Sequence, residues 1–127
     1  MKRIFRSVCA LLLGALCYSC NDKAEFRSVD VTEFTQVIAE KDVVLLDVRT
    51  ADEHAAGHID GTSLHIDVLK EDFEEQALAQ IKKGSTVALY CRSGNRSKRA
   101  ALILAANGYK VIELATGYKG WVETIKQ

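Results

Sequence analysis

The sequence predicts an α/β fold in which a parallel sheet is covered by helices on both faces. Short apolar stretches alternate along the chain with longer stretches of helical character, as is typical of successive β-α-β units. The stretch 43–47 is an almost continuous apolar run, which indicates a strand buried on both faces. The length of 127 residues fits one domain.

The first half of the alternation is marked by a helix cap and a glycine. Asp30 precedes a helical stretch and is a favourable N-cap residue. Gly57 ends the short helical stretch that follows the strand at 43–47. The elements expected here are a weak strand at 26–29, a helix from Asp30 to Glu40, the strand at 43–47, a helix at 51–56 and a short strand at 63–66.

The second half contains the strand that leads to the candidate site. The expected elements are an acidic amphipathic helix at 67–81, strands at 86–90 and 110–114, a helix at 97–106 and a short last helix that contains Trp121. In open α/β sheets, ligands bind beyond the carboxyl ends of the strands. Cys91 directly follows the strand at 86–90 and therefore lies where a ligand is expected.

A seven-residue turn that begins with a thiol joins this strand to the next helix. In such a turn successive backbone N–H groups point inward, and the following helix adds the positive end of its dipole. Two of the residues are arginines, which are permanently charged. We therefore expect a nucleophile beside an anion-binding cradle formed by Cys91, Arg92, Ser93, Gly94, Asn95, Arg96 and Ser97.

Cys91 has two interpretations. A lone Cys at a strand end is most often a small buried hydrophobe, but that interpretation gives no role to the surrounding donors. Helix N-termini and nearby arginines lower a thiol pKa from about 8.5 to roughly 3.5–7.5, so that the thiolate predominates. Cys91 and Arg96 form C-x4-R, one residue shorter than the C-x5-R of cysteine phosphatases, and a shorter loop suits a single sulfur better than a phosphoryl group.

Four blocks of the chain follow one another in an informative order. They are Val43-Val44-Leu45-Leu46-Asp47-Val48-Arg49, the Glu-x-x-x-Gly-His-Ile-x-Gly pattern from Glu53 to Gly61, the loop Tyr90 to Ser97, and Gly108 to Val111 with Gly117 and Trp121. In this order they resemble the blocks of a single-domain rhodanese, a sulfurtransferase. The resemblance spans about residues 26–121, although the chain has no proline and carries Asp60 where the family usually has one.

The resemblance implies sulfur transfer by double displacement. The Cys91 thiolate attacks the outer sulfur of a donor such as thiosulfate, sulfite leaves, and the Cys91 persulfide gives its sulfur to an acceptor thiol or to cyanide. Loop N–H groups from Arg92 to Ser97 stabilise the charged sulfur, and the arginines attract the anionic donor. We expect no cofactor and no metal. The alternatives are a sulfur-carrying or binding module that acts with a partner protein and, disfavoured by the short loop, an arsenate reductase or phosphatase.

Other polar residues have a structural interpretation. Asp47 and Arg49, at a strand end, are expected to brace neighbouring loops, and His58 is expected to support the structure. His54 and His58 have the spacing of a metal-binding pair, but Gly57 interrupts the helix and no further ligands complete the set.

The N-terminal segment is typical of a bacterial lipoprotein signal. Basic residues precede an apolar run at 8–16, far shorter than the roughly 20 residues of a membrane span. Ser19 precedes Cys20, so cleavage between them would leave Cys20 to carry lipid; the alternatives are a conventional signal or an uncleaved anchor. The predicted organisation is a signal at 1–19, a polar tether at 20–25 and a rhodanese domain at 26–127.

Cysteine content and charge describe the expected mature chain. Cys9 and Cys17 would leave with the signal and Cys20 would be lipidated, so Cys91 would be the only thiol. Removing the three basic residues of 1–19 changes 17 basic and 17 acidic residues to 14 and 17, a net charge of −3, which argues against a nucleic-acid partner. We expect a monomer that is held outside the cytoplasm by a lipid and that meets a small anionic sulfur donor and a thiol acceptor.

Overall fold

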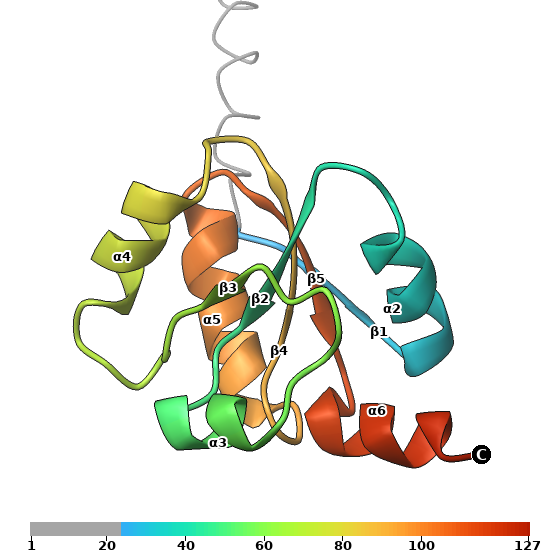
Figure 1. Cartoon of the computed structure of the whole chain (residues 1–127). Helices are drawn as coiled ribbons and strands as arrows, with labels where there is room; N and C mark the ends of the chain where they lie inside the picture. Colours follow the sequence, from blue (N-terminus) through green and yellow to red (C-terminus); the bar gives the residue numbers. More distant parts are fainter. Residues whose placement is uncertain (1–23) are drawn as a thin grey trace, which may run out of the picture.

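The chain folds into a parallel sheet with helices on both faces (Figure 1), as predicted. The structure, a computed structural model, describes residues 24–127. Its elements are β1 (Arg27–Val29), α2 (Val31–Ile38), β2 (Val43–Asp47), α3 (Ala51–Ala56), β3 (Leu64–His65), α4 (Phe73–Gln80), β4 (Thr86–Tyr90), α5 (Asn95–Ala106), β5 (Lys110–Leu114) and α6 (Gly117–Ile125). The five strands lie in the order β1-β5-β4-β2-β3.

The central position of β4 determines where the candidate site lies. β4 pairs in parallel with β2 on one side and with β5 on the other. In the first pair Asp47 lies opposite Tyr90, so both strands end at the same edge of the sheet. Cys91, the residue after Tyr90, therefore lies at this carboxyl edge, with α3 and the start of α6 nearby (Figure 1).

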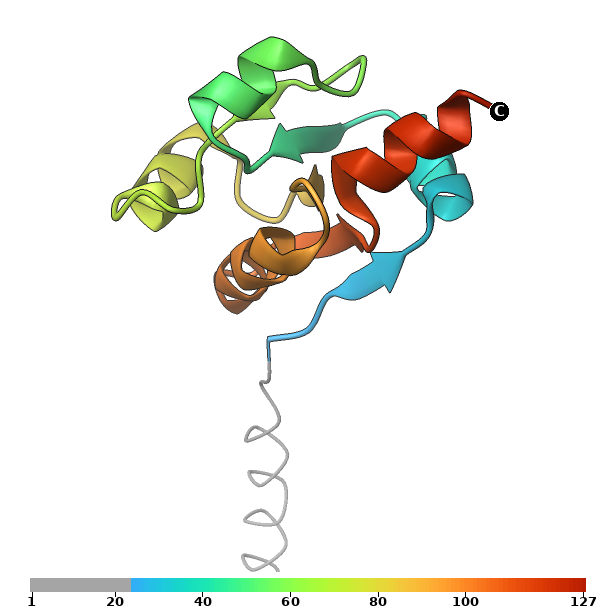
Figure 2. The ribbon, with the colours of Figure 1, turned by 90° about the horizontal axis from the view of Figure 1, so that it is seen from below.

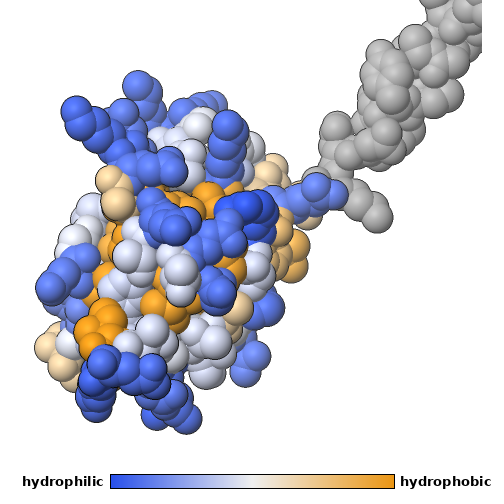
Figure 3. Space-filling view, turned by 90° about the vertical axis from the view of Figure 1, so that its right-hand side faces the viewer, coloured by the Kyte–Doolittle hydropathy of each residue, from blue (hydrophilic) through white to orange (hydrophobic). Residues whose placement is uncertain are grey.

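Two apolar clusters hold the helices against the sheet. Successive residues of a strand face opposite sides, so Leu45 and Leu46 of β2 belong to different clusters. α4 and α5 pack on one face, where Leu104 is fully buried, and α2 and α6 lie on the other, where Phe34 is fully buried (Figure 2). The outer surface seen from the right of Figure 1 is mixed, with small apolar patches between polar side chains (Figure 3).

Most predicted elements are confirmed. The strands at 43–47, 86–90 and 110–114 and the helix at 51–56 have the expected bounds. β1, α2, β3 and α4 are shorter than expected, and α5 begins two residues earlier than the predicted helix at 97–106. Asp30 caps α2 as predicted, since its side chain accepts a hydrogen bond from the backbone N–H of Glu33 at 2.9 Å.

The prediction of a helix over 67–81 is wrong in its first part, because α4 begins only at Phe73. The backbone N–H groups of Ile66 and Val68 donate to the carbonyls of Asp47 and Val48, so these residues stay beside the end of β2. Turns closed by hydrogen bonds from Lys70 to Asp67 and from Phe73 to Lys70 then lead into α4. Val68 is 1% exposed, so its side chain contributes to the core from outside the helix.

The predicted signal at 1–19 and Cys20 lie outside the described residues, as does most of the predicted tether at 20–25. Among residues 24–127, no helix combines the length and apolar character that a membrane crossing requires.

Candidate active site

Cys91 lies at the carboxyl end of β4 as a buried free thiol, 1% exposed. The backbone N–H of Gly94 donates to its Sγ at 3.1 Å. The thiol itself donates to the hydroxyl of Ser97 at 3.4 Å. The sulfur is therefore hydrogen-bonded to two groups that follow it in the chain, the N–H of Gly94 and the hydroxyl of Ser97.

The turn is shorter than the seven residues predicted, because α5 begins at Asn95. Gly94 has a φ of 105°, a left-handed conformation that side chains other than that of glycine rarely adopt. A Cβ at this position would also collide with the carbonyl oxygen of Ala115. Because the helix begins directly after Gly94, Asn95 to Ser97 already belong to the first turn of α5, beside Cys91.

The N-terminus of α6 holds the loop from the other side. The N–H groups of Tyr118 and Lys119 donate to the carbonyls of Cys91 and Arg92 at 2.8 and 3.0 Å. Gly117 makes this contact possible, because a Cβ there would overlap the backbone of Arg92. These two bonds fix the carbonyls of Cys91 and Arg92 on the side of α6, so the N–H groups of the loop are directed toward the sulfur.

The electrostatics of the loop favour the thiolate. Burial alone raises the pKa of Cys91, but hydrogen bonds with the Ser97 hydroxyl and with the N–H groups of Ser97, Gly94 and Ser93 lower it, and the resulting pKa lies below the ordinary value for a thiol. A thiolate is both the nucleophile and the metal-binding form of Cys. Cys91 is therefore placed to react as a nucleophile.

The two arginines of the loop have different surroundings. Arg96 donates to both carboxylate oxygens of Glu53 at 2.7 and 2.9 Å, and this hydrogen-bonded pair lowers the pKa of Glu53 to about 2. The bond connects the loop to α3. Arg92 is exposed and lines the neighbouring cavity, so it presents its charge to an arriving ligand. Ser93 and Asn95 are also exposed.

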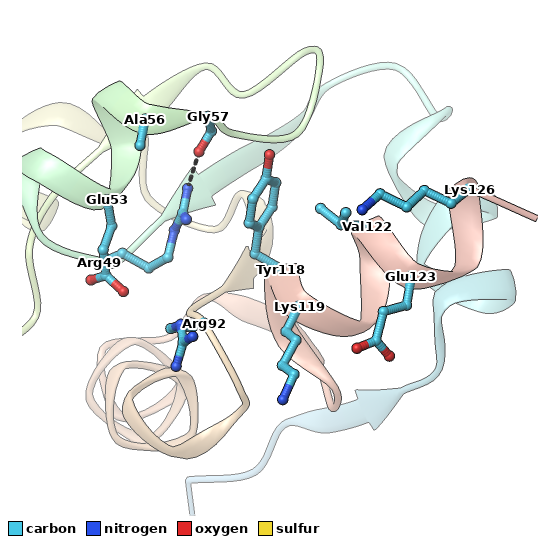
Figure 4. A pocket seen from close by; sticks show the side chains of 10 residues that line it. All are labelled: Arg49, Glu53, Ala56, Gly57, Arg92, Tyr118, Lys119, Val122, Glu123 and Lys126. Carbon is cyan, nitrogen blue, oxygen red and sulfur yellow. Dashed lines mark hydrogen bonds between the residues drawn. The ribbon is translucent and has the colours of Figure 1, made fainter.

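A cavity of about 400 Å³ lies next to the loop, between α3 and α6 (Figure 4). Arg92, Lys119 and Lys126 contribute positive charge, and Glu53 and Glu123 contribute negative charge. The ring of Tyr118 forms part of its wall and stacks under the guanidinium of Arg49, whose central carbon lies 4.4 Å from the ring centroid. The loop therefore contributes one cation, Arg92, to a cavity lined by charges of both signs.

Asp47 and Arg49 form a buried ion pair. They are 0% and 3% exposed, and Arg49 donates to both oxygens of Asp47 at 2.9 and 2.7 Å. Arg49 also donates to the carbonyl of Gly57 at 2.7 Å, and His54 contacts Asp47 at 2.9 Å. Burial opposes the ionised form of Asp47, but the hydrogen bonds with Arg49 and His54 outweigh it and lower its pKa. The pair connects the end of β2 to the end of α3.

His58 lies on the same side of the molecule but is exposed. Its ring stacks on that of His54 with a centroid distance of 4.1 Å, and its Nδ1 lies 3.0 Å from the carbonyl oxygen of His54. Within residues 24–127, no group of three or more His, Cys, Asp or Glu side chains is placed to hold a metal ion.

Two residues at the site were not predicted from the sequence to have these roles. Glu53 binds Arg96, a role that its place at the start of the Glu-x-x-x-Gly-His-Ile-x-Gly pattern does not reveal. Glu113 is a fully buried carboxylate that accepts a hydrogen bond from Ser97 at 2.5 Å. Its signal is an acidic residue with apolar neighbours on both sides in the predicted strand at 110–114, where strand burial makes a carboxylate costly unless it is paired.

Comparison with known proteins identifies the class of protein. The rhodanese-like domain family matches residues 30–124, and the chain belongs to this family. It is 31% identical over 117 residues to thiosulfate sulfurtransferase 18 of Arabidopsis thaliana, covering 83% of this chain and 85% of the relative. It is 34% identical over 98 residues to a sulfurtransferase of Allochromatium vinosum, covering 75% and 87%.

Solved structures show the same fold. A human single-domain sulfurtransferase superposes with a TM-score of 0.65 at 25% identity, covering 78% of this chain and 97% of that one. The family match and the fold therefore agree on a rhodanese-family protein, which has relatives named as sulfurtransferases.

Proposed function

We propose that this protein is a thiosulfate sulfurtransferase-like enzyme that carries sulfur as a persulfide on Cys91. The observation that carries the proposal is the buried thiol of Cys91, whose pKa is lowered by the hydrogen bonds of its own loop. A thiolate formed in advance needs no separate general base to attack a sulfur atom.

The first half-reaction forms one sulfur–sulfur bond and breaks another. The Cys91 thiolate attacks the outer sulfur of thiosulfate, and sulfite leaves with the electrons of the broken bond. Gly94 already donates to Sγ at 3.1 Å, and the N–H groups of Ser93 and Ser97 also favour negative charge there. The exposed guanidinium of Arg92 attracts the anionic donor. An acceptor thiolate or cyanide then takes the outer sulfur and regenerates the Cys91 thiolate.

Intact-mass measurement tests this intermediate. After incubation with thiosulfate, the mass of the protein should rise by one sulfur atom, about 32 Da, and cyanide or dithiothreitol should reverse the change. Cys91→Ser is the matched control and should stay unmodified, since the two side chains differ by one atom. An unchanged mass of the native chain at saturating thiosulfate would overturn the proposal.

A second candidate function is that of a sulfur-carrying or binding module that acts with a partner protein. The cavity beside the loop favours it, because cations and a tyrosine ring line a surface hollow of about 400 Å³, larger than one thiosulfate requires. Such a module would form the persulfide but release sulfur slowly to small thiols. Steady-state turnover with cyanide separates the two functions.

We also propose that the protein is anchored outside the cytoplasm through a lipid on Cys20. The support is the basic start, the apolar run at 8–16 and the Ser19-Cys20 pair. A net charge of −3 after loss of residues 1–19 supports small-molecule partners over nucleic acid. The proposed active species is a monomer without cofactor or metal.

A further inference from the structure

Glu113 is a buried carboxylate one hydroxyl group away from Cys91. It lies in β5, between β1 and β4, and is 0% exposed. Ser97, which accepts the hydrogen bond of the Cys91 thiol at 3.4 Å, donates its own hydroxyl hydrogen to Glu113 at 2.5 Å. A continuous hydrogen-bonded chain therefore runs from Cys91 through Ser97 to Glu113.

The other groups around Glu113 hold the far side of its carboxylate. Ser28 of β1 donates to the second oxygen at 2.5 Å, and the Lys98 ammonium of α5 lies 3.3 Å from the first. Lys98 also donates to the carbonyl of Gly94, and its side chain is 48% exposed. Arg96, which interacts electrostatically with Cys91, is bound to Glu53. One partly hydrated cation therefore faces a carboxylate that is otherwise removed from water.

The hydroxyl of Ser97 has a single hydrogen but two possible acceptors. A serine hydroxyl can donate one hydrogen bond at a time. If Cys91 and Glu113 were both ionised, only one of them could receive it, and two negative charges would lie close together in a buried site. Like charges in such a site disfavour double ionisation. A single proton shared between the two groups would relieve both conflicts.

We propose that Glu113 is the internal acceptor of the Cys91 proton, which reaches it through the Ser97 hydroxyl. In the resting form, Cys91 S–H donates to Ser97 and Ser97 donates to ionised Glu113. In the reactive form the thiol proton is on the Ser97 oxygen, the former hydroxyl proton is on Glu113, and Ser97 donates to the thiolate. Two protons each move by one hydrogen bond, the total charge stays the same, and no proton enters the solvent. Glu113 thus acts as a positioning residue, through Ser97.

The inference deepens the proposed function, since a thiolate produced this way is ready for a sulfur donor, but its test requires no sulfur donor. Two coupled groups lose their protons in two steps that belong to the pair. In the native chain, the ultraviolet absorbance of the thiolate should therefore rise with pH in two steps separated by a plateau. The spectrum of Cys91→Ser, recorded in parallel, is subtracted to remove the other cysteines and the tyrosines.

Glu113→Gln is the decisive variant. Glutamine has the same shape and can accept the hydrogen bond of Ser97, but it cannot take up a proton, so the thiolate should appear in a single step. Ser97→Ala should also give a single step, because it interrupts the chain between the two groups. Glu40→Gln removes an exposed carboxylate and should retain both steps. A merely structural role of Glu113 predicts the same number of steps in all four chains, and that result would overturn the proposal.

Ser28→Ala tests the proposal without removing the acceptor and remains informative if Glu113→Gln does not fold. It deletes one hydrogen bond to the carboxylate, which makes Glu113 a better proton acceptor. The ratio of thiolate to thiol in the plateau should rise by about tenfold, the effect of one hydrogen bond to a charged group. A curve unchanged from that of the native chain would contradict the relay. Persulfide formation, measured separately by mass, decides the proposed function in either case.

Discussion

The ends of β2 and β4 occupy the same position in the fold but are organised in opposite ways. Both strands end at one edge of the sheet, with Asp47 opposite Tyr90, and each leads through a short turn into a helix. At the end of β2, Arg49 and His54 both bond to the carboxylate of Asp47, so these polar side chains are paired within the protein. At the end of β4, the loop N–H groups converge on the single atom Sγ of Cys91.

The difference shows that the polarity of a strand end does not by itself define an active site. The helix after β2 starts with a capping box, in which Thr50 and Glu53 satisfy each other's backbone N–H groups. The helix after β4 has no side-chain cap, and its N-terminal residue follows Gly94. Donors that a cap would occupy are thus available to the sulfur. The first strand end stabilises the fold, and the second is free for chemistry.

The largest effect on stability is expected from breaking the Asp47–Arg49 pair at the end of β2. Asp47→Ala leaves the buried guanidinium of Arg49 without its carboxylate and should lower the free energy of unfolding by about 3–5 kcal/mol. Urea unfolding measures this. Cys91→Ser, the matched change at the other end, should alter stability by less than about 1 kcal/mol while abolishing sulfur transfer. Equal destabilisation by the two substitutions would remove the distinction between the strand ends.

The second prediction concerns the charge beside the thiolate. Arg96 interacts electrostatically with Cys91, so Arg96→Ala should raise the pKa of Cys91. Because the thiolate exists only above this pKa, the acid limb of the rate should move to higher pH. Glu53→Gln removes the anion that faces Arg96 and should move the limb the other way. Shifts of the same sign in both variants would show that loop geometry, rather than charge, controls the thiol.

Much of this architecture could be predicted from the sequence, but the pairing of its charges could not. The apolar run at 43–47 and the strand–turn–helix around Cys91 are local patterns, and they give the sheet and its carboxyl edge. Glu113 is separated from Ser97 by 16 positions and Glu53 from Arg96 by 43, so only the folded topology reveals these bonds. The helix over 67–81 was overpredicted because hydrogen bonds to Asp47 and Val48, which are distant in the sequence, hold Ile66 and Val68 beside the end of β2.

The third prediction concerns the bridge that joins the two strand ends. The hydrogen-bonded partner Arg96 lowers the pKa of Glu53 from 4.5 to about 2. The bridge therefore stabilises the fold above pH 4.5, and this contribution is lost as the pH falls from about 4.5 to about 2. After allowance for solvent screening of a partly exposed pair, the loss should be about 1 kcal/mol.

Denaturant unfolding at several pH values measures this loss, and Arg96→Ala should lose less stability over the same interval. Lys98→Ala removes another cation of α5 and is the matched control, which should retain the dependence associated with Glu53. If native and Arg96→Ala chains lost the same stability on acidification, the bridge would have no role in joining the strand ends.

The smallest effect is expected from a change that touches neither strand end. Cys20 is the proposed site of the lipid anchor, and lipid on this residue would hold the protein at a membrane without a spanning helix. In a bacterial host, the native chain should incorporate labelled fatty acid and sediment with membranes, and Cys20→Ala should lose the label. Its rate of sulfur transfer should be unchanged, because the groups that activate Cys91 all come from residues 28–118.

Label that persists in Cys20→Ala would place the lipid elsewhere, and unlabelled native protein secreted in soluble form would indicate a conventional signal. A lower rate in Cys20→Ala would show that the N-terminal segment contributes to the chemistry assigned here to the end of β4.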